Sequence, residues 1–121
     1  MFAGARKLDN LVVIVDNNGL QIDGKIEDVC SPYPIGDKFK AFNFHVIENV
    51  DAHDFDAIRA AFEEAKATKG MPTAIIFKSV KGKGVSFMEN NAGWHGKAPN
   101  DEEYETAMAE LEKAGEALCQ K

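Results

Sequence analysis

Three short runs of apolar residues constrain the fold of this chain more than any other feature. Residues 11–15 (LVVIV) form an unbroken β-branched run, and residues 44–50 (FHVIENV) and 73–79 (TAIIFKS) are two further strand candidates. A continuous apolar run indicates a strand that is covered on both faces, which is typical of parallel sheets. Because helical patterns separate the runs, the sequence predicts an α/β fold, with a three-layer parallel sheet flanked by helices.

The segments between these runs supply the predicted helices. Asp54 is a candidate N-cap for a helix over residues 55–69, where apolar residues recur at three- and four-residue spacing. Gly70 is expected to end that helix, and Pro72 prevents it from resuming. The other predicted helices are residues 2–8, 35–41 and 101–118.

Composition limits the classes of partner. Fourteen Lys and Arg against 20 Asp and Glu give a net charge of −6, which disfavours binding to nucleic acid or to anionic membranes. No run approaches the ~20 apolar residues that a membrane span needs. Cys30 and Cys119 show neither a disulfide framework nor metal-ligand spacing, so we expect reduced thiols and a cytoplasmic protein.

The predicted strands resemble the centre of a sheet without edge strands. An exposed edge of a parallel sheet is a liability, since its unpaired backbone groups can pair with another chain. We therefore expect neighbouring strands from other polypeptide, and a homo-oligomer.

A polar cluster, residues 16–20 (DNNGL), follows the first predicted strand. Ligands of open parallel sheets bind at the carboxyl ends of strands, so the cluster is well placed for a site. The amide oxygen of Asn18 and the carbonyl of Leu20 suit a hard divalent cation that also holds phosphate oxygens. A calcium loop does not fit, since Leu20 and Gln21 stand where a ligand and a glycine are needed. A plain turn remains the alternative, and residues 20–24 are too short and interrupted to predict a hairpin.

Two later loops also carry candidate residues. Lys81 begins a glycine-rich loop, residues 81–84 (KGKG), whose backbone can approach an anion closely. It matches neither common nucleotide-binding motif, so a solvated basic loop is the alternative. His95 lies between glycines in residues 93–99 (GWHGKAP), where it can reach a ligand and titrate near neutral pH. We expect His45 to be a sheet residue and His53 to belong to the turn before residues 55–69.

Together these segments resemble one family. Residues 8–24, 37–91 and 93–111 are similar to transketolase, and more narrowly to the bacterial transketolase N-terminal subunit, whose partner is a separate C-terminal subunit. The resemblance implies a partial thiamine-diphosphate-binding fold with Mg²⁺ (or Ca²⁺). It also implies transfer of a two-carbon ketol unit from a ketose phosphate to an aldose phosphate, in the pentose phosphate pathway.

The same resemblance assigns residues to roles. The cofactor-binding residues would be Asn18, Leu20, Ile22, Lys81 and His95. Of these, Asn18 and the carbonyl of Leu20 would ligate the metal. His95 would contact the reacting substrate as the catalytic residue, and Lys97 would be a second substrate contact.

One family feature is missing from these residues, namely the Gly-Asp-Gly motif that supplies the acidic metal ligand. We therefore expect residues 1–121 to form a single partial diphosphate-binding domain of a truncated subunit. A preceding segment or a C-terminal subunit would complete it, and the chain alone would have little activity. Two alternatives stay open: a non-catalytic binding or oligomerisation module, and a generic phosphate- or nucleotide-binding domain.

Overall fold

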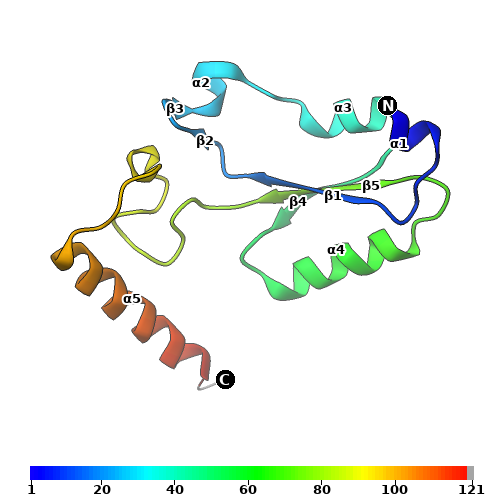
Figure 1. The fold of residues 1–121 in the computed structure, drawn as a ribbon. Helices are drawn as coiled ribbons and strands as arrows, with labels where there is room; N and C mark the ends of the chain where they lie inside the picture. The colour runs from blue at the N-terminus through cyan, green and yellow to red at the C-terminus, as the bar shows by residue number, and fades with distance from the viewer. Residues whose placement is uncertain (120–121) are drawn as a thin grey trace.

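A three-stranded parallel sheet forms the centre of the computed structural model, which describes residues 1–119 (Figure 1). The strand order is β1 (Val12–Asn17), β5 (Thr73–Lys78), β4 (His45–Asp51), so β5 lies in the middle. Helix α4 (Phe55–Ala67) covers one face and α3 (Ile35–Ala41) lies on the other. The predicted three-layer α/β architecture is confirmed.

The core lies between the sheet and α4. Residues 73–77 of β5 are all buried, and Ile75 is fully buried. Two small residues of α4, Ala61 and Ala65, pack in the same cluster as Ile75 and Phe77. Small side chains on a helix let its axis approach a sheet closely, so the alanines explain how α4 covers the central strand.

The predicted element boundaries are correct to within one to three residues. Asp54 caps α4, since its carboxylate accepts hydrogen bonds from the backbone N–H groups of Asp56 at 2.8 Å and Ala57 at 3.3 Å. The helix ends at Ala67, before Gly70, because the next residue already has extended backbone. At the N-terminus, α1 (Phe2–Ala5) is shorter than the predicted helix over residues 2–8, and Lys7 has a φ of 53°.

A small hairpin that the sequence did not predict follows β1. Strands β2 (Leu20–Gln21) and β3 (Gly24–Lys25) pair antiparallel, and α2 (Ile26–Cys30) comes directly after them. Strands of two residues are too short to show an apolar/polar alternation, which is why the sequence pattern did not reveal them.

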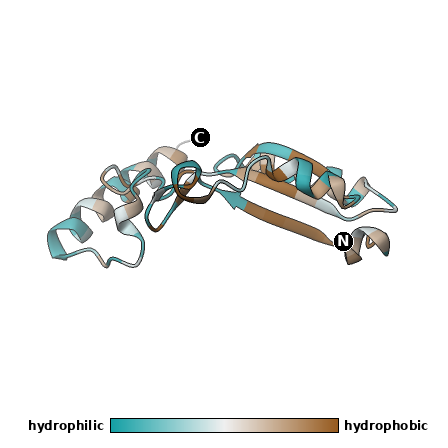
Figure 2. Ribbon diagram, turned by 90° about the horizontal axis from the view of Figure 1, so that it is seen from above, coloured by the Kyte–Doolittle hydropathy of each residue, from teal (hydrophilic) through white to brown (hydrophobic). Residues whose placement is uncertain are grey.

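Helix α5 (Asp101–Cys119) projects away from the sheet, beyond its carboxyl edge (Figures 1 and 2). The 3₁₀ helix η1 (Ala92–Trp94) lies in the connection that leads to it. Glu110 of α5 accepts hydrogen bonds from Ser86, at 2.7 Å from its backbone N–H and 2.5 Å from its hydroxyl. This contact ties α5 to the loop after β5.

Three further features of the described residues concern membrane spans, cysteines and the edges of the sheet. Within residues 1–119, no helix combines the length and apolarity that a membrane crossing requires. Cys30 and Cys119 are free and exposed. In the part of the sheet that the structure describes, β1 and β4 each have β5 as their one neighbour, so both are edge strands.

Candidate functional site

The carboxyl ends of all three strands meet at one edge of the sheet. In the strand register Lys78 pairs with both Asn17 of β1 and Asp51 of β4, so these three residues lie level. The polar residues that follow the strands are thereby gathered in one place, which is where open parallel sheets bind ligands.

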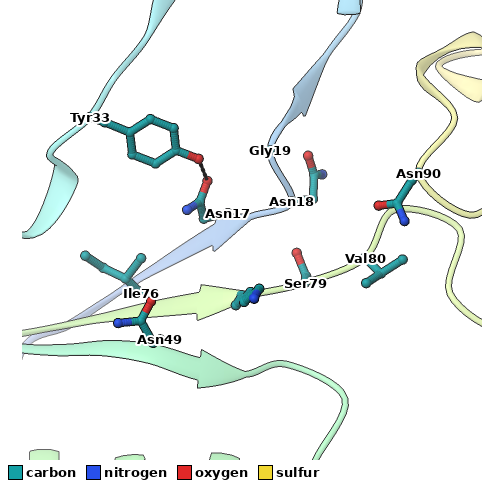
Figure 3. A pocket seen from close by; sticks show the side chains of 10 residues that line it. Asn17, Asn18, Gly19, Tyr33, Asn49, Ile76, Ser79, Val80 and Asn90 are labelled. Atoms are coloured by element: carbon teal, nitrogen blue, oxygen red, sulfur yellow. Dashed lines mark hydrogen bonds between the residues drawn. The ribbon is translucent and has the colours of Figure 1, made fainter. Parts of the chain in front are cut away.

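Two cavities open at this edge, one on each face of the sheet. The cavity on the α3 side (about 460 Å³) is lined by Asn17, Asn18, Gly19, Tyr33, Asn49, Ile76, Lys78, Ser79, Val80 and Asn90 (Figure 3). The cavity on the α4 side (about 630 Å³) is lined by Asp16, Asn18, Ala52, His53, Ile58, Phe62, Phe77, Ser79, Val80, Lys81 and Gly82. Successive strand residues point to opposite faces, so Lys78 faces one cavity and Phe77 the other. Asn18 lies where the two cavities meet.

Asn18 is oriented by a turn of its own backbone. Its Oδ1 accepts a hydrogen bond from the backbone N–H of Leu20 at 2.9 Å, which forms an Asx turn. An amide oxygen has two lone pairs, so Oδ1 keeps one acceptor site for a cation. The turn also holds residue 20 next to that oxygen.

The donor set at this turn fits part of a magnesium shell. Asn18 Oδ1 and the Leu20 carbonyl are hard, neutral oxygen donors, which Mg²⁺ accepts together with phosphate oxygens and one or two carboxylates. Within residues 1–119, no group of three or more His, Cys, Asp or Glu side chains is arranged to hold a metal ion. The donor chemistry of Asn18 and Leu20 therefore fits two ligands of a magnesium shell, and further oxygen ligands would be needed to complete it.

The glycine-rich loop, residues 81–84, lies in two overlapping turns, residues 80–83 and 82–85. Lys83 N–H donates to the Val80 carbonyl, and Val85 N–H donates to the Gly82 carbonyl, each at 3.2 Å. The third residue of each turn is a glycine with positive φ, +71° at Gly82 and +95° at Gly84. Positive φ at this position is what glycine allows and other residues resist. The K-G-K-G pattern thus makes the turns.

Hydrogen bonds from residues outside the loop hold the backbone around Lys81 in place. Lys81 is half-buried and lines the cavity on the α4 side, together with Asn18. Its carbonyl accepts a hydrogen bond from Asn90 N–H at 3.0 Å. A hydrogen bond from Gly84 N–H, at 3.0 Å, is the main reason why the pKa of Glu89 is below its ordinary value. Through this hydrogen bond Glu89 holds the second turn.

The other predicted site residues lie apart from these cavities. Ile22, in the β2–β3 turn, is 62% exposed. His95 ends η1 and is exposed, with its backbone N–H bonded to the Ala92 carbonyl at 2.9 Å. Lys97 is paired with Glu103 at 2.9 Å and sits over the Trp94 ring at 4.0 Å. The structure thus brings Asn18 and Lys81 together in one cavity, with Leu20 hydrogen-bonded to Asn18. Leu20 itself, like Ile22, His95 and Lys97, lines neither cavity.

Sequence reasoning missed several residues that line the cavities. Asn49 lies within a bulge of β4, between Ile47 and Val50, and its φ is 59°. Asn90 has a φ of 53° and faces the region of Asn18 in Figure 3. Tyr33 donates its hydroxyl to Asn17 Oδ1 at 2.8 Å (Figure 3). Asparagine tolerates positive φ better than most residues, and this preference is the one local signal that could have indicated Asn49 and Asn90.

Comparison with known proteins identifies related chains. The family described as "Transketolase, thiamine diphosphate binding domain" matches residues 1–115. A 6-deoxy-6-sulfo-D-fructose transketolase subunit of Clostridium sp. is 42% identical over 115 residues, which cover 95% of this chain and 42% of that subunit. An apulose-4-phosphate transketolase subunit of Phocaeicola vulgatus is 40% identical, over 93% of this chain and 40% of that subunit.

Solved structures of transketolases are also similar to this chain. The crystal structure of transketolase from Campylobacter jejuni superposes with a TM-score of 0.81 at 32% identity, over 94% of this chain and 17% of that one. The chain spans about two fifths of the length of the two subunits that it matches.

Proposed function

Because this chain belongs to the transketolase family through its thiamine diphosphate binding domain, we propose that it provides part of the cofactor site of a transketolase. The complete enzyme would transfer a two-carbon ketol unit between sugar phosphates, and a second subunit or further polypeptide would complete the site. One observation carries the proposal: Asn18 and Lys81, which are far apart in the sequence, line the same cavity at the carboxyl edge of the sheet.

The chain's own residues would bind the diphosphate and its metal. Asn18 Oδ1 and the Leu20 carbonyl would hold Mg²⁺, and the Lys81 ammonium would neutralise a phosphate oxygen as a point charge. Ile22 would lie beside the cofactor as an apolar contact. Thiamine diphosphate, when bound, supplies the electron sink that cleavage of a carbon–carbon bond next to a carbonyl needs.

The loop that follows η1 would serve the substrate. We assign His95 to the reacting end of the sugar, as a hydrogen-bond donor or proton carrier, and Lys97 to a second substrate contact. Two relatives are named as subunits, which supports a partner subunit for this chain as well. That partner would bring further groups to His95.

The test is titration calorimetry of thiamine diphosphate into the purified chain, with and without Mg²⁺ and with and without a transketolase C-terminal subunit. We expect Mg²⁺-dependent binding that the second subunit strengthens. Lys81→Met removes a charge-assisted contact, which is worth about 1.5–3 kcal/mol, so affinity falls about tenfold to a hundredfold. Asn18→Leu should weaken binding and abolish its dependence on Mg²⁺.

Lys83→Met is the matched control, because Lys83 belongs to the same loop but pairs with Glu89 at 3.5 Å and lines neither cavity. It should leave affinity unchanged. Equal losses in Lys81→Met and Lys83→Met would mean that the loop contributes only general positive charge. Failure of thiamine diphosphate to bind in the presence of the second subunit would instead favour a non-catalytic module. If the cofactor binds, a turnover assay of His95→Ala in the assembled enzyme tests the role assigned to His95.

A further inference from the structure

His53 links two loops at the carboxyl edge of the sheet, and no role has so far been assigned to it. The residue lies between β4 and α4, and its ring Nε2 accepts a hydrogen bond from the backbone N–H of Val80 at 2.9 Å. It lines the cavity on the α4 side, as do Asn18 and Lys81. A backbone N–H that donates to Nε2 requires this nitrogen to be unprotonated, so the ring acts as an acceptor here.

The segment that carries His53 is itself fixed to the sheet. The backbone N–H of His53 donates to Asp51 Oδ1 at 2.9 Å. The N–H of the residue before it, Ala52, donates to the carbonyl of Lys78 at 3.1 Å. Lys78 is the last residue of β5, the strand that leads into the glycine-rich loop. His53 is therefore held in place relative to the start of that loop.

Val80, which is hydrogen-bonded to His53, is the first residue of the turn that contains Lys81. Val80 accepts the hydrogen bond that closes this turn, from Lys83 N–H. The peptide between Ser79 and Val80 carries the N–H that points at His53, so the bond sets the direction in which the turn leaves β5. On the far side, Asn90 N–H holds the Lys81 carbonyl. The turn is thus supported at two points, and His53 supplies one of them through a side chain.

We propose that His53 is a positioning residue, which orients the turn at Val80 so that Lys81 faces the cavity shared with Asn18. The proposal rests on the proposed function, in which this cavity takes the diphosphate of the cofactor. It adds a residue that acts through the backbone of the loop.

The first test measures the loop without any ligand, by amide hydrogen exchange of the full chain. His53→Ala removes the acceptor, so we expect the Val80 and Lys83 amides to exchange about five to ten times faster, the effect of one hydrogen bond worth about 1 kcal/mol. His53→Gln offers Oε1 as an acceptor and should restore slow exchange. Unchanged exchange in His53→Ala overturns the proposal.

His45→Ala is the matched control. The His45 ring bonds Glu64 Oε1 at 2.7 Å, at the opposite end of β4, so its loss should leave the loop amides unaffected. Faster loop exchange in His45→Ala, to the same extent as in His53→Ala, would reveal general destabilisation and overturn a specific role for His53.

The second test uses inorganic pyrophosphate with Mg²⁺ as the probe, titrated calorimetrically to millimolar concentration. We expect wild type, His53→Gln and His45→Ala to bind alike, and His53→Ala to bind several-fold more weakly. Equal affinity of wild type and His53→Ala, with faster loop exchange, overturns the link between the His53 contact and phosphate binding. Absence of binding by every variant, with a transketolase C-terminal subunit present, overturns the proposed function of the cavity, while the exchange data separately decide whether His53 holds the loop.

Discussion

Gly82→Ala is expected to disrupt the glycine-rich loop more than a glycine substitution with the same backbone strain elsewhere. Gly82 has a φ of +71°, and a Cβ built there would lie 2.6 Å from the Met88 carbonyl oxygen, a backbone atom. Gly70 has a φ of +75°, but nothing lies within 4 Å of its Cβ position. The pair of variants therefore separates the steric contact from the backbone conformation.

Two contributions to the change in unfolding free energy are common to both variants. Left-handed backbone costs an L-residue about 1–2 kcal/mol. The loss of glycine entropy in the unfolded chain returns about 0.4–1 kcal/mol. In Gly82→Ala the contact must also be relieved, which moves Met88 or the turn. Two nearby hydrogen bonds would be lost, Asn90 N–H to the Lys81 carbonyl at 3.0 Å and Met88 N–H to the Val85 carbonyl at 2.9 Å. At about 1 kcal/mol each, they make Gly82→Ala about 2 kcal/mol more destabilising than Gly70→Ala.

Urea unfolding at constant m-value gives the free energies of both variants, and amide exchange of Asn90 and Met88 reports the loop directly. If Gly82→Ala unfolds the loop only locally, these two amides will exchange faster than in Gly70→Ala, while the global unfolding free energy of the two variants will differ by less than about 2 kcal/mol. The reasoning is refuted if the variants match in both unfolding free energy and exchange of these amides.

Three other predictions concern the core, a helix cap and the attachment of α5. Ile75→Ala, at a fully buried position, should cost about 2–5 kcal/mol in urea unfolding, whereas Ile14→Ala, at a position 55% exposed, should cost less than about 1 kcal/mol; equal losses would contradict the assignment of the core. Asp54→Ala should lower stability by about 1 kcal/mol through the loss of the α4 cap, and Asp54→Asn should retain most of it, because asparagine caps equally well; a similar loss in both would show that charge, rather than capping, matters. The pKa of Glu110 lies below its ordinary value of 4.5, chiefly because the Ser86 hydroxyl and then the Ser86 N–H donate to the carboxylate. A carboxyl with a lowered pKa in the folded state stabilises it fully above its unfolded pKa, and this stabilisation is lost as the pH falls through the lower folded value. The Ser86 amide resonance should therefore shift as the pH is lowered below 4.5, and the shift should vanish in Glu110→Gln but persist in Glu112→Gln.

The sequence allowed the three strands of the parallel sheet to be predicted because each contains a run of apolar residues, and it allowed the long helices to be predicted because each has a cap or a stop. It did not allow the strand order to be predicted. The run at residues 11–15 is more uniformly apolar than residues 73–79, yet β5 is buried along residues 73–77, whereas the residues of β1 are half-buried or exposed. Which of two apolar strands lies centrally depends on pairing across the whole chain.

The site could be predicted where turn signals directly follow a strand, which is the case for Asn18 and for Lys81. It could not be predicted where residues come together through tertiary structure. The contact between His53 and Val80 joins residues 27 positions apart, and the placing of Asn49 depends on a bulge in β4. His95 was identified by its glycine neighbours alone, and these fix the loop around it without fixing where that loop lies. Its role in catalysis stays a prediction.

The strand order has a consequence for how the chain folds during synthesis. β1 and β4 do not pair with each other in the described sheet, and both pair with β5, which is the last of the three to be made. Until residue 78 has left the ribosome, neither β1 nor β4 has the neighbour with which it pairs in the described sheet. Pairing of β1 with β5 joins residues about sixty positions apart (Val12 with Thr73), and such non-local contacts slow folding. The nascent chain is therefore most exposed to aggregation in the interval before β5 appears, and α4, made just ahead of it, is the element available to cover β4 in the meantime.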